Sequence, residues 1–227
     1  MNKNKLILVL TIFCISCSSA KSLRKARQSF LHIVNKHTIS VCNEGVCEEQ
    51  YIYSLGSGFI IGEYDDKQVG LTAGHVCAAS QGSESAIEIS TLNGEYSAVE
   101  GVLVYPNVDV CILTFPNKGY PAIPVAPKPP RIGDKAFSIS APLGTFNSNM
   151  VPMFEGRYLG KVPSPLGIEL DAYSIPGTRG SSGGMIINEK GQVIGMTVMA
   201  RVGLETFTLA VPHELLKVLI DRLNKSS

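Results

Sequence analysis

Short apolar runs separated by glycine and proline dominate the chain from Thr38 onward. These runs are rich in Val, Ile, Thr, Tyr and Phe, and their lengths are typical of β-strands. At the C-terminus, by contrast, the leucines and isoleucines of HELLKVLIDRLN (residues 213–224) recur at helical spacing. The pattern predicts an all-β protein with one C-terminal helix. The expected strands are TISVC, YIYSLGSGFII, VGLTAGHVC, AIEIST, VEGVLVY, DVCILTF, KAFSISAP, MFEGRYLGKV, GIELDAYSI, GMIINEKGQVIGMTVMA and ETFTLAVP.

A proline-rich stretch interrupts the strands near the middle of the chain. Six of the 13 prolines fall within residues 116–130. Because proline has no backbone N–H to donate to a sheet, we expect this stretch to be an extended connector. It divides the strands into two regions, residues 38–115 and 131–212. Within the second region, INEKGQVI with Gly191 at its turn is typical of a β-hairpin.

The first 20 residues have the pattern of a secretory signal peptide. Lys3 and Lys5 precede an apolar run over residues 6–15, and small residues lead to Ala20, after which we expect cleavage. The apolar run is too short to span a bilayer comfortably. We therefore expect an exported protein, either periplasmic or secreted.

Lipid attachment at Cys17 is an alternative fate for this leader, although Cys14 stands where lipoprotein signals usually carry an aliphatic residue. The following residues 21–37, KSLRKARQSFLHIVNKH, are basic and are expected to form a short helix or a lead-in segment. If Cys17 carries lipid, these charges would help to hold the chain near an anionic membrane. A membrane is expected as a partner only in that case.

Composition allows a sizeable core and gives little support to a nucleic-acid partner. The 227 residues are 44% hydrophobic, which is sufficient for one large domain or two small ones. The 20 Lys and Arg residues nearly balance the 19 Asp and Glu residues, for a net charge of +1. Recognition of nucleic acid through its phosphates requires a strongly basic surface, so we expect no such partner.

Four cysteines remain after the expected cleavage, and in an exported chain they suggest two disulfides. In SVCNEGVCEE, the Asn-Glu-Gly segment is typical of a turn, so Cys42 and Cys47 could close a short hairpin. Cys77 and Cys111 could equally be buried free thiols that pack as small hydrophobic groups. None of these four cysteines lies in a C-x-x-C spacing and no H-x-x-x-H spacing occurs, so the sequence does not favour a zinc site, and no metal or cofactor is expected.

The stretch TRGSSGGMI contains the clearest candidate for reaction chemistry. Ser182 lies in a Gly-x-Ser-x-Gly pattern, whereas Ser181 does not have glycine on both sides at this spacing. Gly180 and Gly183 would permit a tight turn that exposes the Ser182 hydroxyl and lets backbone N–H groups converge on one point. A flexible turn between strands is the alternative, because a serine hydroxyl is a weak nucleophile without an adjacent base.

Two residues elsewhere could supply that base and orient it. His75 follows an apolar strand and a small-residue turn in LTAGHVC, where it can face a cleft. Asp109 lies within the apolar run NVDVCILTF, and a buried carboxylate requires a hydrogen-bonding partner. A histidine that Asp109 keeps in one tautomer would be such a partner. Together with Ser182, these residues have the chemistry that acyl transfer requires.

The order His, Asp, Ser in LTAGH, NVDVCIL and GSSGG resembles the trypsin-like serine proteases, and most closely the Do/HtrA-type heat-shock proteases. SLGSGFII, RIGDKAFSISAPLG, ELDAYSIPG, GQVIGMTVMA and FTLAVPHELLKVLI are similar to further strands of that family and to its closing helix. The resemblance covers nearly everything after residue 38. It implies two packed six-stranded antiparallel β-barrels, with the site in the cleft between them.

The same resemblance implies a role for each candidate residue. His75 would be the general base, Asp109 its orienting partner and Ser182 the nucleophile, with the N–H groups of Gly180 and Ser182 forming the oxyanion hole. In that fold the turn after the histidine lies near the strand that carries the aspartate. The resemblance therefore also implies a disulfide between two further residues, Cys77 and Cys111.

Specificity is less well defined by the resemblance. Ser181 stands where the family most often has Asn or Asp, and the loop SIPGTRG is longer than in the heat-shock proteases. This loop should line the specificity pocket, with Val198, Met199 and Ala200 forming another apolar wall. We therefore expect a preference for an aliphatic or small apolar residue before the cleaved bond. No PDZ module is expected within residues 1–227, and the sequence does not indicate an oligomeric state.

The sequence thus predicts an exported serine endopeptidase that acts on polypeptide substrates. Two alternatives stay open at this stage. A protease scaffold can serve as a catalytically silent binding or regulatory protein, since fold does not guarantee activity. An α/β-hydrolase esterase also carries a Gly-x-Ser-x-Gly motif, but it requires a histidine after the serine and alternating strands and helices. Only His213 follows Ser182, and we expect His32, His37 and His213 to be ordinary surface or packing residues.

Overall fold

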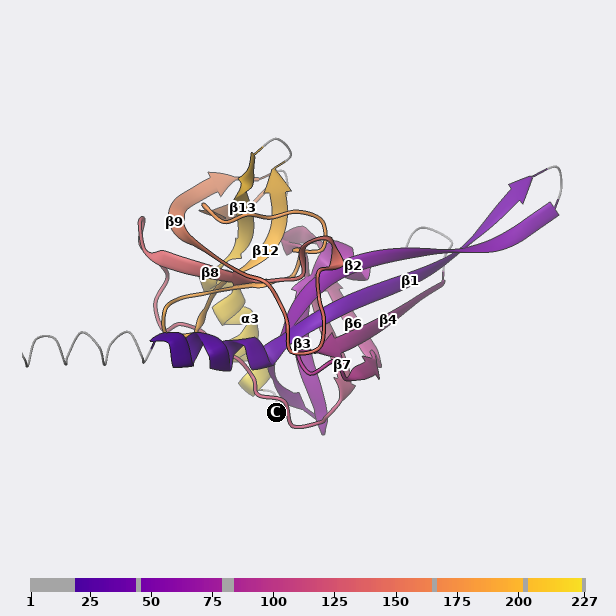
Figure 1. Ribbon diagram of the computed structural model, residues 1–227, viewed down its shortest axis with the longest axis horizontal. Helices are drawn as coiled ribbons and strands as arrows, with labels where there is room; N and C mark the ends of the chain where they lie inside the picture. Colours follow the sequence, from indigo (N-terminus) through magenta and orange to yellow (C-terminus); the bar gives the residue numbers. More distant parts are fainter. Residues whose placement is uncertain (1–18, 44–45, 79–83, 165–166, 202–203, 226–227) are drawn as a thin grey trace, which may run out of the picture.

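The computed structural model describes residues 19–43, 46–78, 84–164, 167–201 and 204–225. Most of the expected signal peptide, with Cys14 and Cys17, lies outside these ranges. The chain folds into two packed β units, followed by a helix at the C-terminus (Figure 1). Within the described residues, no helix is long and apolar enough to span a bilayer.

The first unit is a single antiparallel sheet of seven strands, in the order β5-β4-β1-β2-β3-β7-β6. A six-stranded barrel was expected here, and the structure has a curled half-barrel sheet in its place. The expected strand over residues 99–105 is interrupted where the N–H of Val99 donates to Ile87 O while that of Glu100 donates to Thr114 O. β5 therefore pairs with β4, whereas β6 pairs with β7. The sheet curls, but within the described chain no strand pairing between β5 and β6 closes it. Its strands are β1 (Phe30–Asn43), β2 (Val46–Tyr64), β3 (Lys67–Ala73), β4 (Glu84–Thr91), β5 (Tyr96–Ala98), β6 (Gly101–Tyr105) and β7 (Val110–Pro116).

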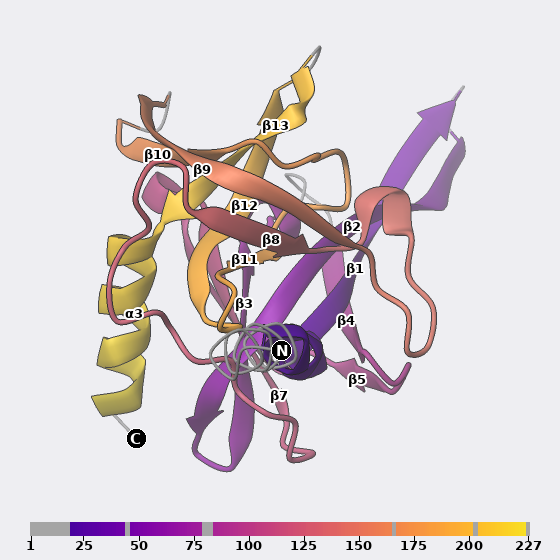
Figure 2. The ribbon, with the colours of Figure 1, turned by 60° about the vertical axis from the view of Figure 1, so that its left-hand side comes forward.

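The second unit is a closed barrel in the order β10-β13-β12-β11-β8-β9, as expected for this half of the chain. The predicted hairpin at Gly191 joins β11 to β12, and Gly191 has a positive φ of 70°. Helix α3 (His213–Lys225) packs against β12 and β13 on the side of the barrel (Figure 2). The strands are β8 (Lys135–Ile139), β9 (Met153–Pro163), β10 (Glu169–Tyr173), β11 (Met185–Ile187), β12 (Val193–Arg201) and β13 (Leu204–Pro212).

Strand β1 begins earlier than the sequence suggested. Residues 19–26 are helical and are followed by the 3₁₀ turn η1 (Arg27–Ser29), but residues 30–37 belong to the sheet and not to a lead-in segment. Positions 31, 33, 35 and 37 are buried, which is the period of two that a strand requires. The pattern was obscured in the sequence because two of these buried residues are polar, Asn35 and His37.

Strands β1 and β2 form a long hairpin that projects from the body of the protein (Figure 1). Neighbouring strand β4 pairs with β1 only as far as Thr38, so the outer part of the hairpin is two-stranded. A disulfide joins Cys42 to Cys47 near the tip, where the two residues are cross-strand partners. Because an isolated two-stranded ribbon is only marginally stable in water, this crosslink helps to hold the projecting part in shape.

A buried carboxylate anchors α3 to the barrel. Asp171 on β10 is 1% exposed, and it accepts hydrogen bonds from the hydroxyl of Tyr158 (3.1 Å) and from the N–H of His213 (3.3 Å). His213 Nε2 lies 2.7 Å from the carbonyl oxygen of Ala126, so this histidine is a packing residue, as expected. Burial raises the pKa of the Asp171 carboxyl above its ordinary value, although the two hydrogen bonds oppose the rise.

This carboxylate predicts a pH dependence of stability. Because the folded-state pKa of Asp171 is raised, the unfolded chain loses the proton first as the pH rises above the ordinary Asp value of 3.8. The wild type therefore loses stability through this window, whereas Asp171→Asn has no such proton to lose. We expect the free energy of unfolding, wild type minus variant, to fall from about pH 4 to about pH 7. Urea unfolding at both pH values measures the difference, and a constant or rising difference would contradict the assignment.

Candidate active site

His75 lies on a four-residue helix that follows the buried strand β3. This helix, α2 (Gly74–Cys77), has its N-cap at Ala73, where β3 ends. A Cβ on Gly74 would lie 3.0 Å from Oδ1 of Asp109 and 3.2 Å from its backbone. Glycine at this position therefore lets the start of α2 approach Asp109 closely.

Asp109 sits at the junction between a 3₁₀ turn and β7. It caps η2 (Pro106–Val108) in the left-handed region, with φ 53° and ψ 48°. Aspartate tolerates this conformation better than most residues, which explains a charged residue at the start of an apolar strand. Its side chain is 16% exposed, compared with 50% for that of His75.

Both carboxylate oxygens of Asp109 bind the same histidine. Oδ1 accepts the backbone N–H of His75 at 2.8 Å, and Oδ2 lies 2.8 Å from Nδ1 of the imidazole. The first bond fixes the start of α2 and the second fixes the ring. A carboxylate at Nδ1 favours the tautomer with the proton on Nδ1, which leaves the lone pair on Nε2. The arrangement can therefore present Nε2 as a proton acceptor.

Ser182 lies on the turn that joins the SIPGTRG loop to β11. Gly180 and Gly183 adopt positive φ values of 86° and 82°. A Cβ on Gly180 would lie 2.5 Å from the carbonyl oxygen of Ala141, and one on Gly183 would collide with Ser57 and Thr72. Both glycines are thus required by conformation and by space, as the sequence pattern indicated.

The N–H groups of this turn fall into two sets. Those of Ser181, Gly183 and Gly184 donate to Thr178 O (3.0 Å), Thr197 O (2.7 Å) and Ser181 O (2.9 Å) respectively. Among the hydrogen bonds of the described residues, neither the N–H of Gly180 nor that of Ser182 has a protein acceptor. These two N–H groups, on alternate residues, can donate hydrogen bonds to an oxygen atom of a bound substrate.

Ser57 holds this turn in place, and sequence reasoning missed it. Its side chain is fully buried, its hydroxyl donates to Gly180 O at 2.7 Å, and the same hydroxyl accepts from the N–H of Ala141 at 2.9 Å. Its backbone N–H donates to Ser182 O at 2.8 Å. The signal in the sequence is the serine between two glycines in SLGSGFII, a stretch whose overall pattern predicts only a strand.

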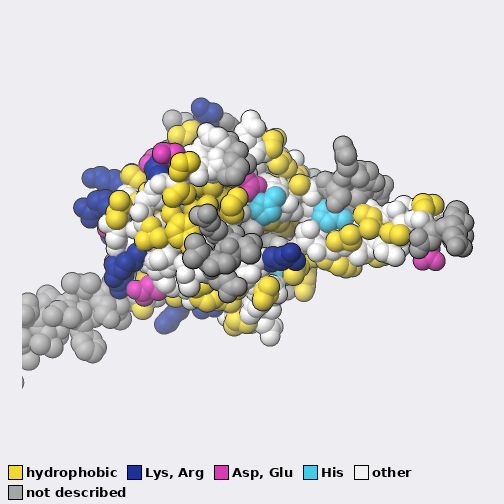
Figure 3. Space-filling model, turned by 90° about the horizontal axis from the view of Figure 1, so that it is seen from above, with side chains coloured by type: hydrophobic (Ala, Val, Ile, Leu, Met, Phe, Trp, Pro, Cys, Tyr) yellow, Lys and Arg dark blue, Asp and Glu magenta, His cyan; other side chains and the backbone are white. Residues whose placement is uncertain are grey.

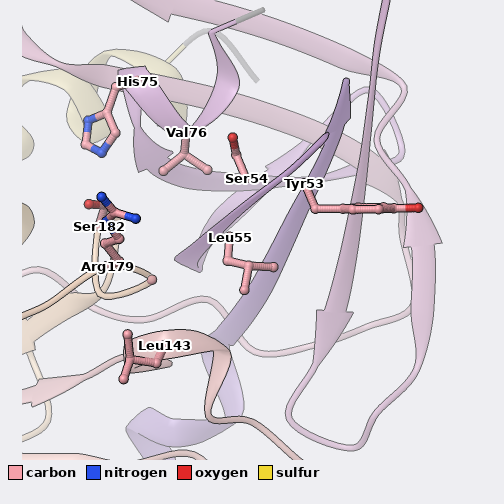
Figure 4. Close-up of a pocket in the computed structure, with 9 residues that line it drawn as sticks. Tyr53, Ser54, Leu55, His75, Val76, Leu143, Arg179 and Ser182 are labelled. Carbon is pink, nitrogen blue, oxygen red and sulfur yellow. The ribbon is translucent and has the colours of Figure 1, made fainter. Parts of the chain in front are cut away.

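His75 and Ser182 line one cavity of about 470 Å³ (Figure 4). The two side chains face each other at one end of the cavity, and Leu55 and Leu143 lie toward the other. The structure therefore brings together His75, Asp109 and Ser182 from three separate segments. The cavity is lined by Tyr53, Ser54, Leu55, His75, Val76, Leu143, Arg179, Gly180 and Ser182.

The residues expected to form an apolar wall of the specificity pocket lie on β12. Val198 is 5% exposed and belongs to the core, while Met199 is 39% exposed. The side chain of Ala200 is outside the described set, and neither Val198 nor Met199 lines the cavity at Ser182 or the one at the SIPGTRG loop. The SIPGTRG loop does line a second cavity of about 300 Å³, together with the η3 turn (Pro142–Gly144) and β9. Its lining residues are Pro142, Leu143, Phe154, Pro176, Gly177 and Thr178.

A second disulfide joins the helix that carries His75 to the strand that begins next to Asp109. Cys77 on α2 is bonded to Cys111 on β7, and each lies two residues after His75 or Asp109 in the sequence. The pairing that the family resemblance implied is thus present. Within the described residues, no group of three or more His, Cys, Asp and Glu side chains could hold a metal ion.

Comparison with known proteins supports the fold and the family. Residues 56–196 match the family model for the trypsin-like peptidase domain. HhoA of Synechocystis sp., which is named as a serine protease, is 28% identical over 188 residues, covering 77% of this chain and 44% of HhoA. This chain therefore spans less than half the length of that relative.

Solved protease structures share the architecture. The serine endoprotease from Yersinia pestis superposes with a TM-score of 0.66 at 22% identity, covering 91% of this chain and 66% of that one. The protease Rv3671c from M. tuberculosis gives 0.69 at 19% identity, covering 89% and 83%. The matched family range covers more than half of the chain and includes His75, Asp109 and Ser182. This chain belongs to the family of trypsin-like peptidase domains.

Proposed function

We propose that this protein is a serine endopeptidase that hydrolyses peptide bonds in polypeptide substrates through an acyl-enzyme. The observation that carries the proposal is the carboxylate-bound imidazole of His75 facing Ser182 across one cavity. Family membership supports the same reaction. No cofactor is required for this chemistry.

In the proposed mechanism, Nε2 of His75 takes the proton of the Ser182 hydroxyl as Oγ bonds to the scissile carbonyl carbon. The π electron pair of the carbonyl moves to its oxygen, and Asp109 stabilises the positive imidazolium that results. When the C–N bond breaks, His75 returns the proton to the leaving amine. Water then attacks the acyl-enzyme by the same route and releases the acid product.

The unused N–H groups of Gly180 and Ser182 form the proposed oxyanion hole. Both belong to the turn that carries the nucleophile, and the N–H of the intervening Ser181 is occupied by Thr178. Such fixed donors stabilise the negative charge that develops on the carbonyl oxygen without having to reorganise. Two donors left unpaired in this turn support an active enzyme over the alternative of a silent binding protein.

An α/β-hydrolase esterase does not fit the structure. Every strand pair between the named strands of the described chain is antiparallel, whereas that fold requires a largely parallel sheet. The one histidine after Ser182 in the sequence is His213, which packs against Ala126 and Asp171.

Export and apolar specificity complete the proposal. Two disulfides are consistent with an oxidising compartment outside the cytoplasm. We propose an apolar residue before the cleaved bond, because Leu143, Phe154 and Pro176 give the cavity beside the nucleophile turn an apolar lining. A cleavage profile from a peptide library that favours Arg or Lys at this position would contradict the proposed preference for an apolar residue.

Casein hydrolysis in the presence and absence of a serine-directed fluorophosphonate tests the function. We expect casein fragments without the reagent and none after pretreatment with it. A metal chelator in a parallel sample should leave hydrolysis unchanged. A folded protein that does not cleave casein, or cleavage that resists the fluorophosphonate, would contradict the proposal.

Ser57→Ala is expected to lower kcat by about 100-fold, the scale of losing one oxyanion donor, with a small change in KM. The substitution removes the hydrogen bond that fixes Gly180 and leaves the buried N–H of Ala141 without its acceptor. Steady-state kinetics on a peptide substrate measures both parameters. The affinity for a peptide aldehyde, whose adduct places an oxygen in the hole, should fall with kcat.

Ser29→Ala is the matched control for this prediction. Ser29 is also a buried serine with one hydroxyl bond to a carbonyl, that of Pro121 at 2.7 Å, but it lies outside the site. We expect it to lose comparable stability, on the order of 1 kcal/mol, and to keep its kcat. An equal loss of kcat in both variants would mean that Ser57 has only a structural role.

A further inference from the structure

The first part of the chain carries a marked excess of positive charge. Seven of the 20 Lys and Arg residues precede Glu44, whereas all 19 Asp and Glu residues lie at this position or after it. The rest of the chain is therefore net negative, although the whole chain is nearly neutral. Figure 3 shows Lys and Arg side chains gathered at the end of the molecule opposite the projecting hairpin of β1 and β2. Such a separation of charge is typical of a protein that binds an anionic surface at one end.

Three of these cations lie on the solvent face of the N-terminal helix, residues 19–26. Lys21, Arg24 and Lys25 are exposed, and their spacing of three and four residues is that of one helical face. The opposite face is packed, since Ala26 is 4% exposed. Within the part of the chain that the structure describes, none of the three cations has an ion pair or a side-chain hydrogen bond. Their charge is therefore available to a binding partner.

The helix is seated firmly on the turn between β11 and β12. A Cβ on Gly191 would lie 2.6 Å from the carbonyl oxygen of Ser22, so the helix backbone approaches the turn as closely as glycine allows. The hydroxyl of Ser19 also donates to the carbonyl oxygen of Glu189 at 3.3 Å. Lys190 lies in the same turn and is exposed. The fold therefore places a fourth cation, from the distant second barrel, beside the cations of the helix.

A cavity of about 260 Å³ lies between the helix and this turn. Lys25 and Lys190 both line it, whereas other parts of the lining, such as Ile123 and the neighbouring prolines, are apolar. Glu189 is the acidic residue of the turn, and its carboxylate lies 3.9 Å from Nζ of Lys135. The cavity thus offers two cations next to apolar atoms. This combination matches a phosphate group that carries an apolar part, as a phospholipid does.

We propose that four cations at this end of the molecule, which we call the basic platform, bind the surface of a bilayer that contains anionic phospholipids. The platform consists of Lys21, Arg24, Lys25 and Lys190. Each Lys or Arg near such a surface adds to the attraction. A bilayer is favoured over other polyanions because the platform begins directly after the expected signal peptide, so this segment meets the membrane first during export. The binding requires no lipid on Cys17, and it does not depend on the proposed proteolytic function.

Docking through the basic platform leaves the active-site cavity accessible. The N-terminal helix lies at the end of the molecule opposite the projecting hairpin (Figure 1). The active-site cavity is instead lined by Tyr53 and Leu55 of that hairpin, together with His75 and Ser182. A protein bound to a membrane through the helix would therefore present this cavity to the surrounding solution.

Partition of the full chain onto lipid vesicles tests the proposal. Vesicles of phosphatidylcholine alone set a baseline, because the apolar residues 6–15 can insert into any bilayer. Phosphatidylglycerol in the vesicles should raise the partition of the wild type above this baseline at about 0.15 M salt, and about 1 M salt should abolish the increase. In the triple variant Lys21→Gln/Arg24→Gln/Lys25→Gln, the increase should fall about 100-fold. The melting temperature should stay unchanged, because the three side chains are exposed and unpaired among the described residues.

Two further variants separate the basic platform from net charge. Lys190→Gln should lower the increase about fivefold, although Lys190 is far from the N-terminal segment in the sequence. The matched control, Lys36→Gln/Lys118→Gln/Lys217→Gln, removes as much charge as the triple variant but from three other segments. Lys118 and Lys217 are each paired with a carboxylate, and Lys36 lies over the ring of Tyr51. We expect this control to keep most of the increase.

Three outcomes would overturn the proposal. They are an absent effect of phosphatidylglycerol on the wild type, an equal loss in the platform and control variants, and wild-type binding by Lys190→Gln. Sedimentation without vesicles identifies a different occupant: an oligomer that dissociates in the triple variant would assign the basic platform to a second copy of this chain and also overturn the proposal. Ser182→Ala should bind the vesicles as the wild type does. The result can therefore be obtained even if the protein cleaves no peptide bond, which would contradict only the proposed function.

Discussion

Ser182→Ala is expected to lower kcat by about 10⁶-fold, because it removes the atom that forms the acyl-enzyme. The substitution leaves the two glycines that shape the turn, and the backbone bond from Ser57 to Ser182 O, in place. Stability should therefore be close to that of the wild type. The residual rate, which the oxyanion hole and binding supply, should still exceed that of the uncatalysed reaction.

Ser181→Ala is the control that distinguishes two adjacent serines. Ser181 is 2% exposed, and its hydroxyl accepts only a long contact of 3.4 Å from the N–H of Thr178. We expect this variant to keep most of its activity in the same peptide assay. Activity lost in Ser181→Ala but kept in Ser182→Ala would show that Ser181, and not Ser182, is the nucleophile.

Asp109→Asn is expected to lower kcat by about 10⁴-fold with little effect on stability. Asparagine tolerates the left-handed conformation of position 109, and its carbonyl oxygen can still accept the N–H of His75. Its amide group, however, would donate to Nδ1 and so place the imidazole proton on Nε2. The ring would then be held in the tautomer that cannot accept the Ser182 proton.

Asp134→Asn controls for the general loss of one carboxylate. Asp134 caps a surface turn, where Oδ2 accepts the N–H of Arg131 at 2.9 Å, and it lies outside the cavity. Single-turnover acylation and urea unfolding should be measured for both variants. Acylation by Asp109→Asn within tenfold of the wild type would show that Asp109 does not orient the base.

The residues proposed for the reaction chemistry are the easiest to find in the sequence, because each stands out against its neighbours. A carboxylate at the start of an apolar strand and a serine among glycines both carry a physical cost that needs a reason. The sequence therefore pointed to His75, Asp109 and Ser182; in the structure His75 and Ser182 line one cavity, and Asp109 binds the imidazole of His75. The expected disulfide between Cys77 and Cys111 came only through the resemblance, because spacing alone left free thiols possible.

The features that were missed depend on distant contacts. Ser57 looks like any polar residue in a strand, and its role becomes visible only when Gly180 and Ala141 are brought to its hydroxyl. The early start of β1 was obscured because Asn35 is buried, where its amide donates to Val76 O at 3.0 Å. The interruption at Val99 likewise follows from tertiary hydrogen bonds that no local pattern encodes.

The projecting hairpin of β1 and β2 could not have been derived from the strand pattern alone. The sequence predicted strands on both sides of the Asn-Glu-Gly turn and the crosslink between Cys42 and Cys47. It did not indicate where β3 and β4 stop pairing, and this decides which apolar residues are exposed. Tyr51 and Tyr53 therefore resembled residues of a covered sheet.

Labelling by a fluorophosphonate tests the central claim most directly, because the reagent bonds to an activated serine oxygen with loss of fluoride. After digestion with trypsin, Ser181 and Ser182 lie in one peptide, residues 180–190, and fragmentation distinguishes them. The account predicts a single adduct on Ser182 in the wild type, none in Ser182→Ala, and much slower labelling in Asp109→Asn. A folded wild type that stays unlabelled, or an adduct on any other serine, would contradict it.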